Sequence, residues 1–288
     1  MKRTCCAVLF VICTLFLFAQ NDSINIASKD NTGMVTESAQ AKPVYDLKPA
    51  IDIPVFVTGA GWSAYAFTKI YSKDRSSIDK ILSLDKNDIN GFDRWAVRPH
   101  SEKVSKSSNY IFGGSIPLPM LFLAFKDTRK DFFKLGFLYL EAMSITGLMY
   151  TGSVYLTDRF RPYAYSDETP MEWRTRGGAK NSFYAGHVAL VATSTFFMAK
   201  VYADYNPGSK IKWVFYGLAG LATGSVAYMR HRGGFHFPSD IILGITQGTL
   251  TGIFVPHFHK NKLVKDPKLT LLPYSDGRAN GITLVHKF

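Results

Sequence analysis

Residues 230–240 read RHRGGFHFPSD, a short basic and glycine-rich segment between two long apolar ones. Pro238 suits the first turn of a helix, because its missing N–H would be unpaired there in any case. A helix that starts here puts Asp240 about one turn beyond His236, where a carboxylate can hold the imidazole of a nucleophile or general base. Arg230, beyond the glycines, is placed to clamp an anionic oxygen. The alternative is a structural histidine beside a helix-capping aspartate.

The chain of 288 residues carries a net charge of +12, and 47% of its residues are hydrophobic. This composition is typical neither of a disordered chain nor of a uniformly apolar membrane protein. A basic chain favours anionic partners such as phosphate esters, lipid head groups or nucleic acid. The basic residues are scattered through loops and form no nucleic-acid-binding motif, so we expect no nucleic-acid partner.

The N-terminus has the pattern of a secretory signal peptide, residues 1–19, with a basic start, a short apolar core and Ala19 before the cleavage point. All three cysteines, Cys5, Cys6 and Cys13, lie inside it. Removal of the signal would therefore exclude disulfides, a cysteine nucleophile and cysteine-ligated zinc. Residues 20–50 are polar and are predicted to form an N-terminal arm. We expect an exported protein of a bacterial cell envelope.

Long apolar segments follow the arm and predict an all-α bundle of about six helices. They lie at 52–68, 110–125, 134–156, 187–203, 213–229 and 239–255. The third is long enough to span a bilayer, and small residues in several segments would allow close helix packing in a membrane. Membrane helices are favoured, but buried helices of a soluble bundle have the same pattern. A Gly59-Ala60-Gly61 break leaves open whether the first segment crosses completely.

The loop at 157–186 is crowded with basic residues and leads directly into a new apolar segment. Glycine at a helix start, free backbone N–H groups and nearby guanidinium groups together predict an anion site. The residues that make up this candidate site are Arg159, Arg161, Lys180, Gly186 and His187.

The remaining C-terminal residues, 257–288, differ in kind from the apolar region at 51–256. Two short alternating runs around a turn predict a β-hairpin-like tail, which we treat as an appendage. His257 and His259, beside lysines, are expected at the membrane surface. We see no histidine or carboxylate cluster with ligand spacing, so neither a metal nor another cofactor is expected.

Taken together, these motifs resemble the three-part signature of the type 2 phosphatidic acid phosphatase (PAP2) superfamily, which includes bacterial lipid phosphatases, soluble acid phosphatases and vanadium haloperoxidases. The Arg-x5-His-x3-Asp motif is matched in full by Arg230, His236 and Asp240. The Gly-His of the second motif and the Arg-Pro that ends the first are matched by Gly186-His187 and Arg161-Pro162. The resemblance covers about residues 50–256 and favours the bacterial lipid phosphatase branch.

The resemblance implies a metal-independent phosphatase that acts through a phosphohistidine. His236 would attack phosphorus, with Asp240 fixing its tautomer, and His187 would protonate the leaving alkoxide. The phosphate oxygens would be held by Arg161, Arg230 and the Gly186 N–H. Arg159 and Lys180 are further candidate phosphate ligands. The expected substrate is a lipid phosphate or diphosphate, such as phosphatidic acid, phosphatidylglycerol phosphate, undecaprenyl diphosphate or the phosphates of lipid A.

Two positions depart from the superfamily pattern. The lysine of the first motif is Val154 here, and the serine of the second is Ala185. Each loss removes a donor to phosphate. A catalytically weak or inactive lipid-binding relative is therefore one alternative, a soluble-type acid phosphatase is another, and haloperoxidase chemistry is a third. Oligomeric state is left open.

The distribution of basic loops predicts which way the site faces. The short loops at 126–134 and 205–212 and the tail beyond 256 are basic, and by the positive-inside rule they are cytoplasmic. The catalytic loops would then face the periplasm. Six complete spans after a cleaved signal would give the reverse orientation, so the number of spans is left open.

Overall fold

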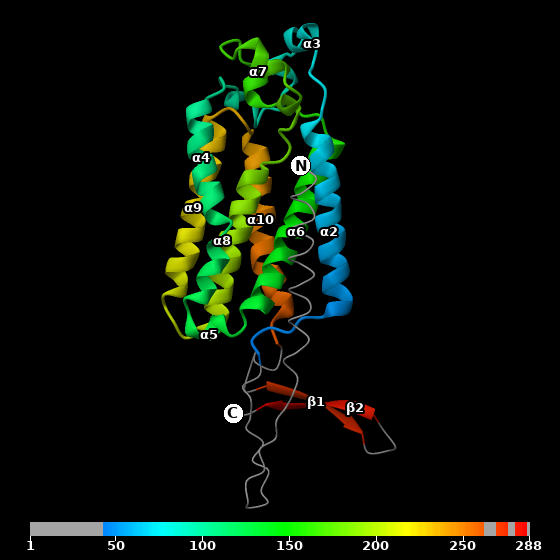
Figure 1. Ribbon diagram of the computed structural model, residues 1–288, viewed down its shortest axis with the longest axis vertical. Helices are drawn as coiled ribbons and strands as arrows, with labels where there is room; N and C mark the ends of the chain where they lie inside the picture. Colours follow the sequence, from blue (N-terminus) through cyan, green and yellow to red (C-terminus); the bar gives the residue numbers. More distant parts are fainter. Residues whose placement is uncertain (1–42, 262–268, 276–279, 287–288) are drawn as a thin grey trace, which may run out of the picture. The chain divides into compact units, whose positions relative to one another are not determined.

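The computed structural model describes residues 43–261, 269–275 and 280–286, and its main body is a helical bundle (Figure 1). The fold is all-α, as predicted. The helices are α2 (Pro49–Tyr71), α3 (Ile78–Leu82), α4 (Glu102–Ser115), α5 (Lys126–Arg129), α6 (Phe132–Leu156), α7 (Met171–Thr175), α8 (Gly186–Tyr205), α9 (Lys212–Arg232) and α10 (Pro238–His259). Short 3₁₀ turns lie at Lys86–Asp88, Arg94–Ala96, Leu118–Leu123, Pro162–Tyr165 and Gly177–Lys180.

The long helices run alongside one another, with α8 at the centre of most of the contacts (Figure 1). Helix α10 packs along α8, and α6 packs against both. Helix α2 covers α6, while α9 and α4 cover α8 from another side. The ends of α6 and α9 and the starts of α8 and α10 are therefore brought to the same end of the bundle.

Two predicted segments differ from the observed helices. The segment expected at 110–125 is divided, because α4 ends at Ser115 and Pro117 and Pro119 begin a 3₁₀ turn, where a regular helix loses backbone hydrogen bonds. Helix α2, by contrast, continues without interruption through Gly59 and Gly61. A Cβ at Gly59 would lie 2.9 Å from the carbonyl oxygen of Ser144. That glycine serves close packing of α2 on α6 and does not break the helix.

A stripe of three glycines sets the contact between α10 and α8. Gly244, Gly248 and Gly252 are four residues apart and so share one face of the helix. A Cβ at these positions would lie 2.8, 2.2 and 2.6 Å from the carbonyl oxygens of Ala185, Ala189 and Thr193 respectively. The two backbones thus touch along three successive turns, which is the close approach that small residues permit between helices.

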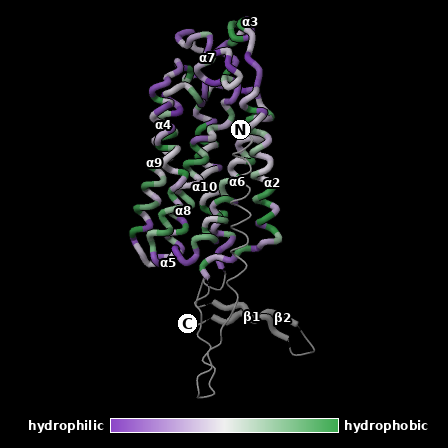
Figure 2. The backbone as a smooth tube through the Cα atoms, viewed as in Figure 1, coloured by the Kyte–Doolittle hydropathy of each residue, from purple (hydrophilic) through white to green (hydrophobic). Residues whose placement is uncertain are grey.

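Apolar side chains also face outward from the bundle. The tube in Figure 2 shows hydrophobic stretches along the long helices and hydrophilic ones near α3 and α7. Exposed large side chains include Trp213, Leu218 and Leu221 on α9 and Ile242, Leu250 and Phe258 on α10. Within the described residues, α6 and α10 are long and apolar enough to cross a membrane.

The C-terminal residues form the predicted hairpin. Strand β1 (Leu269–Ser275) pairs with β2 (Asn280–His286) in antiparallel register, with Leu269 opposite His286. The predicted signal at 1–19 and the arm up to residue 42 lie outside the described residues.

Candidate active site

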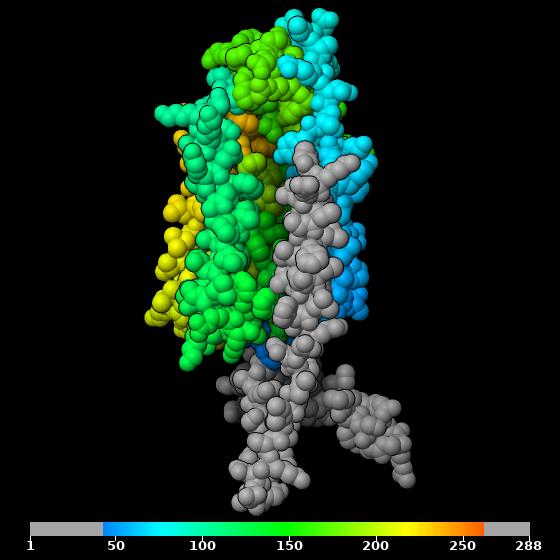
Figure 3. Space-filling view, viewed as in Figure 1, coloured from blue at the N-terminus to red at the C-terminus, as the bar shows by residue number. Residues whose placement is uncertain are grey.

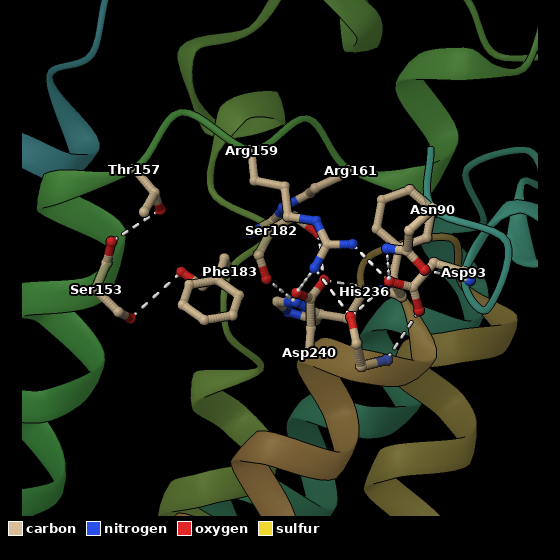
Figure 4. Close-up of polar contacts among 12 residues, drawn as sticks. Asn90, Asp93, Ser153, Thr157, Arg159, Arg161, Ser182, Phe183, His236 and Asp240 are labelled. Carbon is tan, nitrogen blue, oxygen red and sulfur yellow. Dashed lines mark hydrogen bonds and ion pairs between the residues drawn. The ribbon is translucent and has the colours of Figure 1, made fainter. Parts of the chain in front are cut away.

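One end of the bundle is covered by the loops that carry α3 and α7. These two short helices contact each other, and Figure 3 shows their segments gathered at that end. The two loops are joined by a backbone hydrogen bond of 2.9 Å from the Ser76 N–H to the Thr175 carbonyl, and by Arg75, which donates to the Thr175 hydroxyl at 2.8 Å. Beneath this cover, three segments far apart in the sequence, 90–93, 159–187 and 230–240, meet (Figure 4).

The turn before His236 depends on a glycine. Gly234 has a φ of 77°, in the left-handed region that glycine adopts without strain. A Cβ there would lie 2.9 Å from the Pro99 carbonyl oxygen. Its own carbonyl accepts a hydrogen bond from the Tyr163 N–H at 3.1 Å. The turn is therefore held between two loops, and it fixes where His236 enters the site.

His236 is 3% exposed, and its Nδ1 lies 2.7 Å from the Ser182 carbonyl oxygen. A carbonyl only accepts, so the neutral imidazole carries its proton on Nδ1 and leaves the lone pair on Nε2. Sequence reasoning expected Asp240 to hold this ring. In the structure the Ser182 backbone holds it instead.

Asp240 turns away from the imidazole because it is the third residue of α10. Its carboxylate reaches back to the Phe237 N–H at 3.0 Å, as an acidic residue at this position of a helix commonly does. The same oxygen accepts from the Ser182 hydroxyl at 2.6 Å. Asp240 therefore acts on His236 through Ser182, by fixing the residue whose carbonyl binds the ring (Figure 4).

Arg159 links the three segments and does not face the histidines. It binds Asp240 at 2.5 Å and Asp93 at 2.7 Å, and it donates to the Ser239 hydroxyl at 3.0 Å. Its guanidinium also lies 4.7 Å from the centre of the Phe237 ring. This arginine, expected among the phosphate ligands, is instead used to neutralise two buried carboxylates.

Asp93 does not pair with its neighbour in the chain, Arg94. Arg94 instead binds the backbone carbonyls of Asn87 and Ile89. Asp93 is fully buried and accepts from the Ser239 hydroxyl (2.6 Å) and from Asn90 (2.8 Å). Burial alone would raise the pKa of Asp93, but these hydrogen bonds and that of Arg159 outweigh it and hold the pKa below its ordinary value.

Arg161 and Arg230 come together around Phe235. Each guanidinium carbon lies 5.0 Å from the centre of that ring. Arg161 donates to the Asn181 carbonyl at 3.2 Å. Arg230 donates to Asn109 at 2.9 Å, but its Nε is buried and has no hydrogen-bond partner among the described residues. One buried and one half-buried positive charge, with an unused donor, form a site that favours an anion.

Burial and the charges of both arginines lower the pKa values of His236 and His187. Burial, followed by the charges of Arg161 and Arg230, lowers the pKa of His236 well below its ordinary value. Burial, then Arg230 and Arg161, lowers the pKa of His187 to about 3. Both imidazoles are therefore neutral in the free protein at neutral pH, and the arrangement brings together the four side chains expected to handle phosphate.

His187 is the second residue of α8, and its ring lies against that of Phe112 at 4.4 Å. Gly186 precedes it as the first residue of the helix, where the backbone N–H has no partner within the helix. A Cβ at Gly186 would lie 2.4 Å from the Tyr150 ring. Glycine is required there because Tyr150 occupies the adjacent space.

His100 also lies in this region, although nothing in the sequence singled it out. Its ring stacks on Trp173 at 4.0 Å and meets Phe235 edge-on at 5.1 Å. Burial, then the charge of Arg161, lowers its pKa. A lone histidine followed by a helix start carries no sequence signal that separates this position from an exposed one.

A family model, described as the PAP2 superfamily, matches residues 135–263, a range that contains every motif residue placed above. The matched region covers somewhat less than half of the 288-residue chain and carries the PAP2 pattern. This match supports a phosphatase of the PAP2 type, a phosphoric monoester hydrolase. Among solved structures, it is similar to the "first transmembrane PAP2 type phosphatidylglycerolphosphate phosphatase from Bacillus subtilis". The identity is 17% and the TM-score 0.41, over 72% of this chain and 94% of that one. No curated protein matches it.

The position that departs from the PAP2 first motif, Val154, is fully buried in an apolar cluster with Ala66 and Ile70. The amine nearest this point is that of Lys73, which donates to the carbonyls of Val154 and Thr157 and to Asp158, each at 2.8 Å. Three acceptors use all three of its protons. In this PAP2 protein the lysine at the end of α6 is therefore structural.

The other departure, Ala185, is fully buried and precedes α8. Its N–H donates to the Asp240 backbone carbonyl at 3.2 Å. Lys180, expected as a substitute phosphate ligand, lines a polar pocket with Lys73 and Asp158. The structure thus shows no lysine taking over the missing donor among the contacts described for the motif residues.

The described residues contain one group able to hold a metal ion, namely Asp52, Glu141 and His259. It lies at the opposite end of α10 from Asp240. His259 was expected at the membrane surface, but its side chain is only 10% exposed because it turns toward two buried carboxylates. Sequence spacing could not reveal this group, since its members come from three different helices.

Proposed function

We propose that this PAP2 phosphatase hydrolyses a lipid phosphate or diphosphate monoester through a phosphohistidine on His236. The observation that carries the proposal is the contact of the His236 Nδ1 with the Ser182 carbonyl, which leaves Nε2 as the nucleophilic atom. Arg161 and Arg230, close enough to lower its pKa, supply positive charge for the phosphate oxygens.

In the first step the Nε2 lone pair attacks phosphorus, the N–P bond forms and the bond to the alcohol oxygen breaks. His187 gives its proton to the leaving alkoxide. In the second step His187 takes a proton from water, whose oxygen attacks phosphorus. The N–P bond then breaks, which releases inorganic phosphate and restores neutral His236.

His187 has to be protonated for the first step. In the free protein burial and two arginines hold its pKa at about 3. A bound phosphate offsets the charge of these arginines, and so raises the proton affinity of His187 when substrate is present. Binding and proton uptake are therefore coupled in this mechanism.

The lipid substrate class is supported by the outward-facing apolar side chains of α9 and α10 and by two helices long enough to cross a membrane. We infer that the protein works at the membrane of the cell envelope, with the covered end of the bundle toward the periplasm. That orientation follows from the basic loops at 126–134 and 205–212. Val154 and Ala185 favour one alternative, a weakly active or inactive lipid-phosphate-binding protein.

The test is phosphate release by the full chain in detergent, with and without EDTA, from phosphatidic acid, phosphatidylglycerol phosphate, undecaprenyl diphosphate and lipid A. Wild type and His257→Ala should release phosphate, and His236→Ala should not. His257, near the far end of α10, is the matched control. Release unchanged in His236→Ala would contradict the mechanism. Lipid binding without release by folded wild type would establish the binding alternative.

The covalent intermediate can be sought directly. His187→Ala lacks the group that activates water, so a phosphorylated enzyme should accumulate with a substrate that has a good leaving group. The phosphoryl group should be stable to alkali, labile to acid and located on His236 by mass spectrometry. Phosphorylation at another residue would contradict the assignment.

A further inference from the structure

Three ligand-type side chains from three helices meet at the end of the bundle away from the motif residues. Asp52 lies in the first turn of α2, Glu141 in α6 and His259 is the last residue of α10. The His259 Nε2 is 3.1 Å from an Asp52 oxygen and 3.6 Å from a Glu141 oxygen. All three ligand atoms lie within 4.8 Å of one another.

The hydrogen bonds of His259 decide what Nε2 offers to this cluster. Its Nδ1 lies 2.7 Å from the Val255 carbonyl oxygen. In the neutral form of the ring this contact places the proton on Nδ1, so that the Nε2 lone pair is available to a cation held beside the two carboxylates. A backbone carbonyl at the second nitrogen is the arrangement that commonly orients a metal-binding histidine.

Glu141 gives the second, independent indication of a cation-binding site. It is 4% exposed, and its Oε2, directed at His259, has no hydrogen-bond partner among the described residues. A buried carboxylate without compensation is strongly unfavourable. Asp52, which is 1% exposed, is partly compensated because it accepts from the Lys48 N–H at the start of α2. For the Glu141 Oε2 the described residues supply only the contact with His259, at 3.6 Å.

Two lysines near this end of the bundle, Lys200 and Lys260, are used elsewhere. Lys200 pairs with Asp204, and Lys260 binds the other oxygen of that carboxylate at 2.8 Å. Tyr45 donates to Asp204 as well, at 2.8 Å. When its two carboxylates are ionised, the Asp52–Glu141–His259 cluster is acidic, and a divalent ion bound there would offset that charge.

The spacing suits a small metal ion. Ligand atoms at about 2.0–2.2 Å from a tetrahedral zinc lie about 3.3–3.6 Å from one another, close to the two contacts of His259. One imidazole and two carboxylates form a donor set suited to Zn²⁺ and related first-row ions.

We propose that Asp52, Glu141 and His259 bind a divalent transition-metal ion of the Zn²⁺ class, which ties α2 and α6 to the end of α10. The ion takes no part in the chemistry of the phosphate site, because its ligands lie at the far end of α10. Its role is to stabilise the bundle.

The test uses the full chain, purified in detergent, stripped with a chelator and titrated with Zn²⁺ alone. We expect one metal per chain by elemental analysis and a melting temperature that rises with free Zn²⁺. Co²⁺ should give the visible absorption of a low-symmetry tetrahedral or five-coordinate site. Glu141→Gln and His259→Gln should weaken binding by about 100-fold or more. His257→Gln, two residues from His259, is the matched control and should bind as wild type does.

Two results would overturn the proposal. One is the absence of stoichiometric metal on folded wild type at micromolar free Zn²⁺, a measurement that depends on no variant. The other is equal affinity in wild type and Glu141→Gln. Phosphate release is not the readout, so failure here leaves the proposed phosphatase mechanism untouched.

Discussion

The Nδ1 of His236 and the carbonyl oxygen of Ser182 are 2.7 Å apart, and this contact leaves Nε2, the atom proposed to attack phosphorus, as the free ring nitrogen. The Ser182 hydroxyl is in turn held by Asp240 at 2.6 Å. Asp240, the aspartate of the third motif, therefore acts on His236 indirectly, because it fixes the position of the Ser182 carbonyl. Several consequences can be measured.

Replacement of Ser182 by alanine should lower kcat by about 10- to 100-fold with little change in KM. The carbonyl remains, but the hydroxyl that fixes it to Asp240 is lost, and small misplacements of a catalytic group are costly. Steady-state kinetics on the best lipid substrate would measure this. Ser194→Ala removes another fully buried hydroxyl, remote from the motifs, and should keep kcat. Equal effects of the two variants would mean that Ser182 has only a packing role.

His236 should make stability depend on pH in a defined direction. Its pKa is lowered in the folded protein by burial and by two arginines, so below about pH 6.5 the unfolded chain binds a proton that the folded chain does not. Stability is then lost as pH falls through that value, by up to about 1.4 kcal/mol per pH unit. Thermal unfolding between pH 7.5 and 5 should show a shallower decline for His236→Gln. Parallel curves would contradict the buried neutral state.

Asp93→Asn should destabilise the protein by about 3 kcal/mol, because it leaves the guanidinium of Arg159 with one buried partner fewer. The exposed Asp158, paired with Lys73, is the control, and Asp158→Asn should cost less than about 1 kcal/mol.

The pKa of Asp93 also predicts in which direction its contribution to stability changes with pH. It is lowered in the folded protein, so the contribution to stability is present above about pH 3.9 and is lost as pH falls through the folded value. Chemical denaturation should therefore show a difference in the free energy of unfolding between wild type and Asp93→Asn that becomes smaller only below about pH 4. If this difference becomes smaller already near neutral pH, the pKa of Asp93 is not lowered.

Restoring the superfamily lysine as Val154→Lys should not raise the rate of phosphate release. Val154 is fully buried among apolar side chains, and the Lys73 amine already binds its carbonyl. Burial of a second ammonium group there should lower stability by at least about 2 kcal/mol relative to Val154→Met. The measurements are the melting temperature and kcat/KM of both variants. A rise in kcat/KM for Val154→Lys would contradict this prediction, because it would show that the site can use the lysine of the superfamily pattern.

Much of the fold was readable from apolar periodicity and a few motifs. Five of the six long segments correspond to α2, α6, α8, α9 and α10, because each is bounded by polar loops. The division after Ser115 was missed, although Pro117 and Pro119 were a visible signal.

The candidate site was predicted less completely. The ordered motifs singled out His236, His187, Arg161 and Arg230, and the structure brings these four side chains close together at one end of the bundle. The roles of Ser182 and Asp93 depend on contacts across 54 and 66 residues, and a single sequence carries no record of such pairs. Arg159 was expected to bind phosphate, but a guanidinium near a motif can bind a carboxylate as readily as a phosphate.

The glycines at 244, 248 and 252 have a practical consequence for anyone who modifies this protein. His187 of α8 and Asp240 of α10 keep their spacing through direct contact of the two backbones, without adjustable side chains between them. Substitutions along this seam of three glycines would change both the packing of α8 on α10 and the turnover of substrate. The exposed face of α9 touches neither the seam nor the candidate active site. A library for expression or detergent tolerance should therefore vary the surface of α9 and leave the seam as it is.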